Sequence, residues 1–313
     1  MTVHHVFANR SNIGDWLSAQ GIQALLGVPD VREHFCDAPF VEETILQLAE
    51  ADEDDLILIG GGGLLMDYFL PFWDAFVEIA DRLRYVLWGV GAVDLKREAS
   101  LPPVDLIERV VAGSLLTVVR DDLTRDLLAA ADLPPPVPCP SMLAVPRAGE
   151  PGWGVLHVAN YTTAGADVHD TMRAEARSFA ERTSRPFRET NNLIEPGRRD
   201  QLDRTLGMYR DSDLIVSSGL HGCILGLAVG RPVVAVSGDR KLDSFMAAAG
   251  LSRWVLSQEE TGRLGGLLEN AFLQPDTAGF VRRGVEANRR VAAQVRDLLR
   301  PRHRQAAGKA GGA

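Results

Sequence analysis

A proline-rich stretch, LPPPVPCPSMLAVPRAGEPG, interrupts the chain near its middle, at residues 133–152. Proline fixes φ and lacks a backbone donor, so this stretch neither continues a helix nor forms a central strand. Short apolar runs alternate with helix-patterned segments on both sides of it. At 313 residues the chain is also longer than one ordinary core requires. We therefore predict two α/β domains joined by a semi-rigid connection.

The alternation predicts a doubly wound parallel sheet in each half, because strands separated by whole helices need right-handed crossovers. Strands are expected at residues 3–8, 55–59, 84–89, 115–119, 153–159, 186–190, 213–216, 232–236 and 253–256. Helices are expected at residues 15–26, 41–51, 69–83, 104–111, 121–131, 167–183, 198–210, 221–229, 242–249 and 259–272. Ligands of such folds bind at the carboxyl ends of the strands, so a site is expected in the cleft between the domains.

The predicted domain limits follow from this pattern. They are an N-terminal Rossmann-like domain at 1–135, expected on the acceptor side, a linker at 136–152, a C-terminal Rossmann-like domain at 153–275, expected on the donor side, a basic amphipathic helix at 276–300 and a disordered tail at 301–313. The last helix has apolar residues on one stripe and arginines on the other face. That pattern indicates either packing on a domain with a solvated face or contact with an anionic lipid or polymer at a membrane surface.

Composition argues against several classes of function. The net charge of −9 disfavours general nucleic-acid binding, which needs a basic surface. Cys36, Cys139 and Cys223 are far apart and have no ligand-like histidine spacing, so neither a zinc site nor a disulfide framework is expected. No apolar run approaches the roughly 20 residues that span a bilayer, and no signal peptide is apparent. We expect a soluble cytoplasmic protein.

Two glycine-containing strand ends in the first half predict a ligand-facing edge. In SNIGDW, residues 11–16, Gly14 allows a tight turn, and Asp15 is either the helix cap or a carboxylate of the site. In LILIGGGGLLMD, residues 56–67, a buried strand runs into four glycines, more than a tight turn requires. A loop of this kind lets the backbone approach a ligand closely. The run is neither a GxGxxG fingerprint nor a P-loop.

Charged residues follow two other predicted strands. Arg120, in VVRDDLTRDLL, binds a carboxylate or phosphate, pairs with Asp121, or belongs to a helix cap. Arg240 and Lys241, in GDRKLDSF, either form a solvated charge pair or belong to the same edge of the sheet.

One histidine stands at a junction of the second half that is otherwise small or apolar. In DLIVSSGLHG, His221 follows a strand and a small-residue turn and opens a helix. It is either a structural histidine or a group that exchanges a proton with an anion at the helix N-terminus.

Taken in order, these motifs resemble the polysaccharide pyruvyl transferase family, whose members move pyruvate from phosphoenolpyruvate onto sugar hydroxyls. The family pattern comprises Asn-x-Gly-Asp, Gly-Gly-Gly-x-Leu, Val-Arg-Asp, Ser-x-Arg-Leu-His, Gly-x-Pro and a later Lys. The matching positions, within about residues 10–250, are Asn12, Gly14, Asp15, 60–65, Val119, Arg120, Asp121, Ser217, Leu220, His221, Gly230, Pro232 and Lys241.

The resemblance implies two Rossmann-like domains in a glycosyltransferase-B-like arrangement, with no metal and no cofactor besides phosphoenolpyruvate as the donor substrate. It implies a sugar or glycan acceptor, as in polysaccharide biosynthesis, and catalytic roles for His221 and Asp15. His221 would act as acid and base, and the helix that starts near Gly222 would hold the donor anion. The substrate-binding residues that it implies are Asn12, Gly14, Gly61, Gly62, Gly63, Arg120, Asn160, Ser217, Ser218, Gly222, Arg240 and Lys241.

The chain departs from the family pattern at Gly219, where the family has an arginine beside Leu-His. The segment HVANYTT, which contains His157 and Asn160, also lacks an arginine that the family often has there. Either another cation (Lys241, Arg240 or Arg198) replaces it, or the donor differs, or transfer activity is lost. A nucleotide-sugar glycosyltransferase and a non-catalytic binding protein are therefore the alternatives to a pyruvyl transferase.

Overall fold

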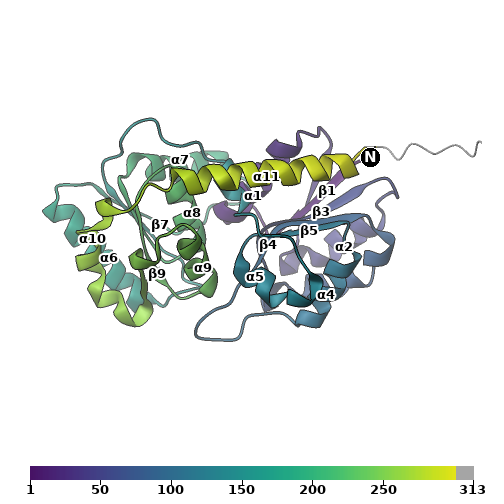
Figure 1. The fold of residues 1–313 in the computed structure, drawn as a ribbon, viewed down its shortest axis with the longest axis horizontal. Coiled ribbons are helices and arrows are strands. Elements are labelled where there is room, and N and C mark those ends of the chain that lie inside the picture. Colours follow the sequence, from purple (N-terminus) through teal and green to yellow (C-terminus); the bar gives the residue numbers. More distant parts are fainter. Residues whose placement is uncertain (301–313) are drawn as a thin grey trace, which may run out of the picture.

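A computed structural model describes residues 1–300, which form two parallel five-stranded sheets flanked by helices (Figure 1). The first sheet has the order β2-β1-β3-β4-β5 and consists of β1 (Val3–Phe7), β2 (Val31–Phe35), β3 (Leu56–Leu65), β4 (Tyr85–Ala92) and β5 (Leu116–Val119). The second has the order β10-β9-β8-β6-β7 and consists of β6 (Val155–Val158), β7 (Phe187–Thr190), β8 (Leu214–Ser217), β9 (Val233–Ser237) and β10 (Val255–Ser257). The predicted doubly wound α/β class is confirmed.

Helices connect successive strands in both halves. The first domain contains α1 (Ile13–Leu26), α2 (Val41–Ala49), α3 (Leu70–Val77), α4 (Val104–Gly113) and α5 (Asp122–Leu127). The second contains α6 (Ala166–Arg182), α7 (Arg199–Asp211), α8 (Leu220–Ala228), α9 (Arg240–Ala248) and α10 (Leu264–Leu268). The last helix is α11 (Ala278–Leu298). Residues 301–313, which include the predicted tail, lie outside the described part of the chain.

Different helices cover the two faces of the first sheet. β3 shows the reason, because successive side chains of a strand point to opposite faces. Leu56 and Leu58 pack with α1 and the C-terminal half of α11, whereas Ile57 and Ile59 pack with α2, α3 and α4. All four side chains are buried, as expected for a parallel sheet covered on both faces.

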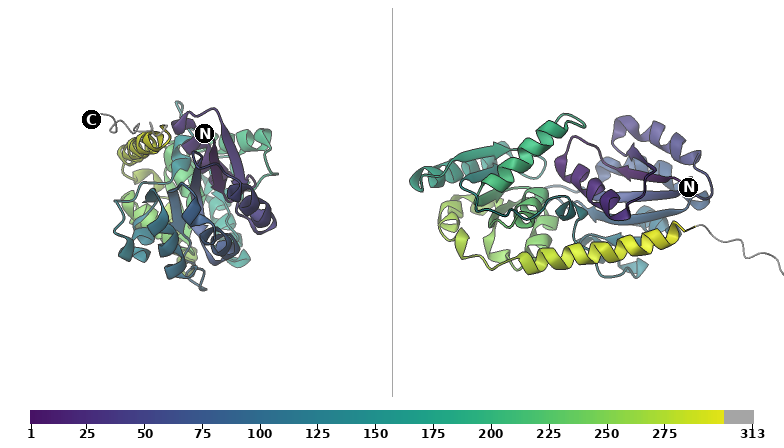
Figure 2. Two further views of the ribbon diagram at one scale, coloured as in Figure 1. Left: turned by 90° about the vertical axis from the view of Figure 1, so that its right-hand side faces the viewer. Right: turned by 90° about the horizontal axis from the view of Figure 1, so that it is seen from above.

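The helix α11 crosses both domains, as Figures 1 and 2 show. It packs on α1, on α8 and on a short 3₁₀ helix of the linker, Pro140–Leu143. Asn288 fixes its position, since its Oδ1 accepts a hydrogen bond of 3.0 Å from Trp88 Nε1 and its Nδ2 donates to the Pro138 carbonyl at 2.9 Å. The helix thus ties the first sheet to the linker and to the second domain.

The two domains also meet at backbone bridges beside the ends of their strands. Asn12, before α1, pairs in antiparallel fashion with Leu193, after β7. Leu95, after β4, pairs in the same way with Asp239, after β9. The carboxyl ends of the two sheets therefore face each other across the domain interface.

Three expectations about local structure are wrong. The sequence patterns miss the edge strand β2, VREHF, because three successive charged or polar residues interrupt the alternation of apolar and polar positions that marks a strand. The glycine run is part of β3 rather than a loop, and β3 bulges there, with φ of +83° at Gly61 and +124° at Gly62. The helix expected at 259–272 is broken into short helical pieces, since Gly262, Gly265 and Gly266 lower its helix propensity.

The structure also bears on the question of a bilayer-spanning segment. In the described chain, none of the helices combines the length and the hydropathy that a membrane crossing requires.

Candidate functional site

A cavity of about 410 Å³ lies between the two domains, where the carboxyl ends of the strands meet. This volume is within the range of small-molecule sites. Segments that follow β1, β3 and β5 form one side, and segments that follow β6, β8 and β9 form the other. The predicted site residues that line the cavity are Asn12, Asp15, Gly63, Arg120, Asn160, His221, Gly222 and Lys241.

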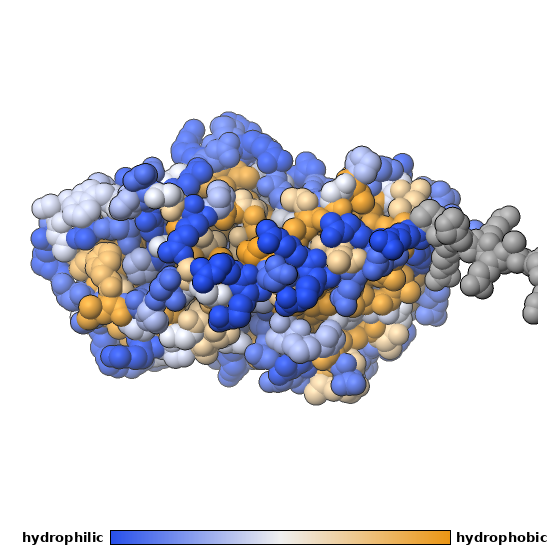
Figure 3. All heavy atoms as spheres, turned by 45° about the horizontal axis from the view of Figure 1, so that its top comes forward, coloured by the Kyte–Doolittle hydropathy of each residue, from blue (hydrophilic) through white to orange (hydrophobic). Residues whose placement is uncertain are grey.

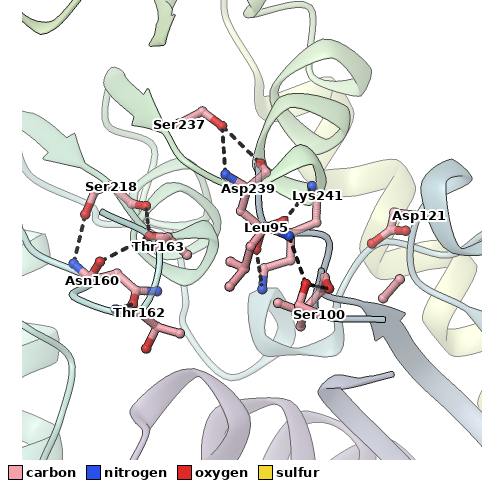
Figure 4. A network of polar contacts seen from close by, with 12 residues as sticks. Leu95, Ser100, Asp121, Asn160, Thr162, Thr163, Ser218, Ser237, Asp239 and Lys241 are labelled. Atoms are coloured by element: carbon pink, nitrogen blue, oxygen red, sulfur yellow. Dashed lines mark hydrogen bonds and ion pairs between the residues drawn. The ribbon is translucent and has the colours of Figure 1, made fainter. Parts of the chain in front are cut away.

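Two cations, Arg120 and Lys241, converge on one wall of this cavity. A Cβ at Gly63 would lie 3.4 Å from Arg120 Nη2 and 3.8 Å from Lys241 Nζ, so both groups face the same point. Arg120 is buried and pairs with Asp121 at 3.2 Å. Lys241 pairs with the buried Asp239 at 2.7 Å (Figure 4), and burial lowers the pKa of this lysine. Each cation thus has one carboxylate partner and further donors for an anionic ligand.

Asp15 lies in the first turn of α1 and faces the cavity. It is not the helix cap, because Asn12 has that role: Asn12 Oδ1 accepts a hydrogen bond of 2.9 Å from the Gly14 amide. The carboxylate lies against the backbone of Gly62, where a Cβ would come within 2.5 Å of Oδ1. Burial raises the pKa of Asp15 to about 7, against the opposing effect of the two cations. Asp15 therefore exchanges its proton near neutral pH, as a general acid or base must.

His221 lies in the first turn of α8 and crosses the domain interface. A Cβ at Gly14 would lie 2.0 Å from His221 Nδ1, so only a glycine leaves room for this ring. On its other side, Nε2 is 3.8 Å from Cys139 Sγ, and that thiol also contacts the hydroxyls of Ser18 at 3.0 Å and Ser141 at 3.3 Å. Burial and the two cations lower the pKa of His221 to about 3. With no anion bound, His221 is a neutral imidazole at pH 7.

The N-terminus of α8 also faces the cavity. Its N-cap residue, Gly219, supplies no side-chain acceptor, and within the described structure the first turn of α8 carries no acidic residue. Gly222, in the same turn, lines the cavity. The first amides of a helix lack intrahelical partners and attract negative charge. This end of the cavity is therefore suited to an anion.

Asn160 occupies the space beside Gly219. A Cβ at Gly219 would lie 2.9 Å from Asn160 Cβ and 3.1 Å from its Nδ2. Asn160 is itself held by two hydrogen bonds: its amide donates to Ser218 Oγ at 2.8 Å, and its Oδ1 accepts from the Thr162 amide at 3.0 Å (Figure 4). A longer side chain at position 219, such as the arginine that the resemblance expects, therefore requires Asn160 to move.

Some predicted site residues lie outside the cavity. Arg240 pairs with Asp94 of the first domain at 2.8 Å, since the start of α9 turns this side chain away from Lys241. Arg198 is exposed and pairs with Asp200 at 2.8 Å. The remaining predicted residues are buried and not among those that line the cavity: Gly14, Gly61, Gly62, Ser217 and Ser218.

The cavity also has a rim that the sequence patterns do not indicate. Asp37 follows the missed strand β2 and accepts a hydrogen bond of 2.6 Å from Asn9 Nδ2; burial raises the pKa of Asp37. Tyr68 and Tyr161, from different domains, are both more than half exposed, at 52% and 56%. Further lining residues are Ser11, Met66, Phe69, Thr162, Thr163, Asn191, Asn192 and Leu193. VREHF has no alternating or continuous apolar pattern, so the sequence gives no clear signal for a strand before Asp37.

Among residues 1–300, no three His, Cys, Asp or Glu side chains are placed to hold a metal ion. His157, in the HVANYTT segment, is buried and its Nδ1 contacts Glu189 at 3.1 Å. That the reaction needs no metal or cofactor stays a prediction.

The family model described as polysaccharide pyruvyl transferase matches residues 12–240, most of the chain. The matched span begins at the cap of α1 and includes the glycine run, Arg120 and His221. No curated protein is significantly similar to the chain in sequence.

Solved structures share the fold at low sequence identity. S. aureus MnaA, in a structure with UDP, has a TM-score of 0.57 and 9% identity, over 95% of this chain and 96% of that chain. The UDP-GlcNAc 2-epimerase of Methanocaldococcus jannaschii, in complex with UDP-GlcNAc and UDP, has a TM-score of 0.56 and 10% identity, over 94% and 100%. An uncharacterized protein of Klebsiella pneumoniae has a TM-score of 0.52 and 11% identity, over 81% and 90%. These likenesses confirm the glycosyltransferase-B-like arrangement and show the fold alone.

Proposed function

Since this chain belongs to the polysaccharide pyruvyl transferase family, we propose that it transfers pyruvate from phosphoenolpyruvate to two hydroxyls of a sugar or glycan precursor, as a ketal. One observation carries the proposal: two cations and an open helix N-terminus meet a carboxyl with a pKa of about 7 in a single interdomain cavity. The cations and the helix N-terminus form a site for an anion, and the carboxyl beside them is a group that can transfer a proton.

The proposed reaction needs a proton donor, a proton acceptor and a site for phosphate. The methylene carbon of the donor takes a proton, while the first acceptor hydroxyl attacks the adjacent carbon and loses its own proton. The bond between that carbon and the phosphate oxygen then breaks, and inorganic phosphate leaves. The second hydroxyl forms the second C–O bond, and its proton passes to the phosphate. The products are the ketal and inorganic phosphate.

The donor anion is assigned to the side of the cavity where Arg120, Lys241 and the start of α8 meet. Arg120 provides planar, paired donors that suit a carboxylate or phosphate, and Lys241 provides a point charge. Both lie near Gly63, which lines the cavity and has no room for a side chain, because a Cβ there would come within 2.6 Å of Val93 Cγ2. In this arrangement Arg120 and Lys241 supply the positive charge that Gly219 does not.

Binding of the donor changes the proton affinities of His221 and Asp15. The two cations lower the pKa of both groups, and an anion beside these cations offsets that effect. With the donor bound, the pKa of Asp15 rises further, so the carboxyl holds its proton and can give it to the methylene carbon. The pKa of His221 rises toward neutrality, so the imidazole can accept the proton of the attacking hydroxyl. We assign the acid role to Asp15 and the base role to His221.

The acceptor is assigned to the rim formed by Tyr68, Tyr161 and Asp37. Aromatic faces pack on the C–H surfaces of sugar rings, and carboxylate and amide groups form hydrogen bonds with sugar hydroxyls.

The free thiols of the chain fit a reducing compartment, so we also propose a cytoplasmic location.

The test is phosphate release by the purified protein from phosphoenolpyruvate in the presence of a panel of glycosides. Gly91→Ala probes the donor side, because a Cβ there would lie 2.1 Å from Arg120 Nε and displace the guanidinium. We expect this variant to raise KM for the donor about tenfold or more with less effect on kcat, because one charged contact is lost. Gly266→Ala is the matched control, since its Cβ meets open space.

Two other results would overturn the proposal. Thermal stabilisation by UDP- or GDP-sugars, with none by phosphoenolpyruvate, would identify a nucleotide-sugar enzyme of the same fold. Binding of phosphoenolpyruvate without turnover for any glycoside would identify a non-catalytic member of the family. In that case Gly219→Arg combined with Asn160→Gly is the variant to assay for recovered turnover, because the single Gly219→Arg change collides with Asn160.

A further inference from the structure

A second hollow lies outside the catalytic cavity, between α1, α11 and the linker. We call it the α11 groove; its volume is about 420 Å³. Its walls are apolar and include Leu25 of α1, Leu143 of the linker, and Val281 and Val285 of α11. These four side chains are only partly covered by the rest of the protein. The groove therefore offers apolar surface that no part of the described chain fills.

Three arginines stand on the rim of this apolar groove. They are Arg147 of the linker and Arg282 and Arg289 of α11, and all three side chains are exposed. Arg147 and Arg289 have only long contacts with exposed carboxylates, 3.7 Å to Asp276 and 3.7 Å to Glu286. Arg282 makes no ion pair within residues 1–300. Exposed pairs of this kind hold an arginine weakly, so the rim has charge available for a partner.

The positive charge of this face contrasts with the charge of the whole protein. α11 carries five arginines and two acidic residues, although the chain has a net charge of −9. Figure 3, which brings the α11 face forward, shows apolar surface beside the hydrophilic residues of this face. Cationic and apolar groups side by side match a partner that is anionic at one end and apolar at the other.

From this arrangement we infer that the α11 groove docks the protein on an anionic lipid bilayer, with a lipid chain entering the groove and the lipid phosphates contacting Arg147, Arg282 and Arg289. An anionic polysaccharide would use the arginines and leave the apolar walls exposed to water. A second copy of this chain would bring the same arginines together, and the carboxylates beside them in the described chain, Asp276 and Glu286, already pair with Arg147 and Arg289. A bilayer satisfies both the charge and the apolar surface.

The test is flotation of the full chain with vesicles of phosphatidylcholine, with and without phosphatidylglycerol, at low and high salt. We expect binding to the anionic vesicles alone, and weaker binding at high salt because salt screens these contacts. The double variant Arg282→Gln, Arg289→Gln should lower the vesicle affinity about 25-fold, roughly fivefold for each arginine. Arg32→Gln combined with Arg109→Gln is the matched control, because both arginines are exposed on β2 and α4, away from the groove.

A second pair of variants tests the apolar wall. Ala24→Asp places a carboxylate on an exposed position of the groove, and we expect it to reduce vesicle binding without changing the melting temperature. Ala112→Asp, on the exposed side of α4, is its control. Three results would overturn the inference. The first is no binding to anionic vesicles, and the second is equal binding by the wild type and the double arginine variant. The third is binding of a soluble polyanion that Ala24→Asp does not weaken and that anionic vesicles do not displace. A dimer in sedimentation velocity that Ala24→Asp dissociates would also overturn it, in favour of a self-association surface.

Discussion

Two strand–turn–helix units face each other across the interdomain cavity, and the N-termini of their helices differ. At the start of α1, Asn12 caps the helix and Asp15 supplies a carboxyl in the first turn. At the start of α8, Gly219 supplies no cap, and the first turn holds His221 and no acidic group in the described structure. The same local fold thus presents an acid on one side and an open, electropositive helix end on the other.

In the proposed reaction, this difference lets one cavity bind two substrates. At the α1 end, Asn12 already occupies the Gly14 amide and Asp15 is proposed to hold a proton, so this end suits a neutral sugar hydroxyl and a proton donor. The α8 end leaves its amides for a ligand and has Lys241 and Arg120 beside it. The four predictions below alter one end or the other, from the largest expected effect to the smallest.

Loss of the imidazole at the α8 end is expected to have the largest effect. His221→Ala should lower phosphate release by roughly 10³–10⁴-fold, near the upper limit for a lost acid–base group. Donor binding, measured by calorimetry, should persist because Arg120 and Lys241 remain. His221→Gln keeps a polar side chain of similar length and serves as the control for packing against Gly14. Wild-type turnover in either variant would remove His221 from the reaction.

Loss of the carboxyl at the α1 end is expected to lower turnover by about 10²–10³-fold. Asp15→Asn also tests the raised pKa. Burial raises the pKa of Asp15 from 3.8 to about 7, so between these values the folded chain holds a proton that the unfolded chain has released. The stability given by the protonated carboxyl is therefore lost as pH rises through this window. Asparagine is neutral at every pH, so the variant should melt at a higher temperature than wild type at pH 8 and show no such gain at pH 4.

A melting difference that is the same at pH 4 and pH 8 would contradict the raised pKa of Asp15. An unchanged pH profile of turnover in a partly active Asp15→Asn protein would contradict its role in proton transfer.

Adding a cap to α8 makes the two helix ends alike. Gly219→Asp places a carboxylate where the donor anion is proposed to bind, so the donor Kd should rise about tenfold. Gly219→Ala is the control, because it makes the same Cβ contact with Asn160 and adds no charge. If both variants bind phosphoenolpyruvate equally well, the start of α8 does not hold the anion.

Removing the cap of α1 is expected to have the smallest effect. Asn12→Ala should lower the free energy of unfolding by about 1 kcal/mol, the usual effect of a lost N-cap. Urea denaturation measures it, and Asn270→Ala is the comparison, since Asn270 is exposed and its side chain donates to the Gly266 carbonyl at 3.0 Å but caps no helix N-terminus in the described chain. A loss no larger than that of Asn270→Ala would mean that Asn12 matters through its bridge to Leu193 rather than as a cap.

Much of the fold follows from periodicity in the sequence. Buried strands such as β3 and β8 read as continuous apolar runs, because a parallel sheet is covered on both faces. The apolar pattern does not indicate β2, because an edge strand exposes charged side chains. It therefore does not indicate Asp37 either, which lies just beyond the end of this strand. At 259–272 the error is the opposite one, since an element was predicted that the structure lacks. The apolar pattern predicts one helix, but glycines lower its helix propensity and the segment forms short helical pieces. Most of the cavity nevertheless lies where the sequence predicts a site, at the carboxyl ends of the predicted strands.

Arg240 and Lys241 show that the sequence alone does not determine the direction of a side chain. As adjacent residues at one strand end they are equivalent in the sequence, which supplies the residue types and their place beside the cleft. The tertiary structure separates them: Arg240 binds Asp94 across the interface, and Lys241 faces the cavity beside Arg120. The same holds for Asp15 and His221, whose types suit proton transfer but whose pKa values of about 7 and about 3 come from burial and from charges distant in sequence. Local pattern determines which groups reach the strand ends, whereas side-chain direction and proton affinity depend on the packing of the two domains against each other.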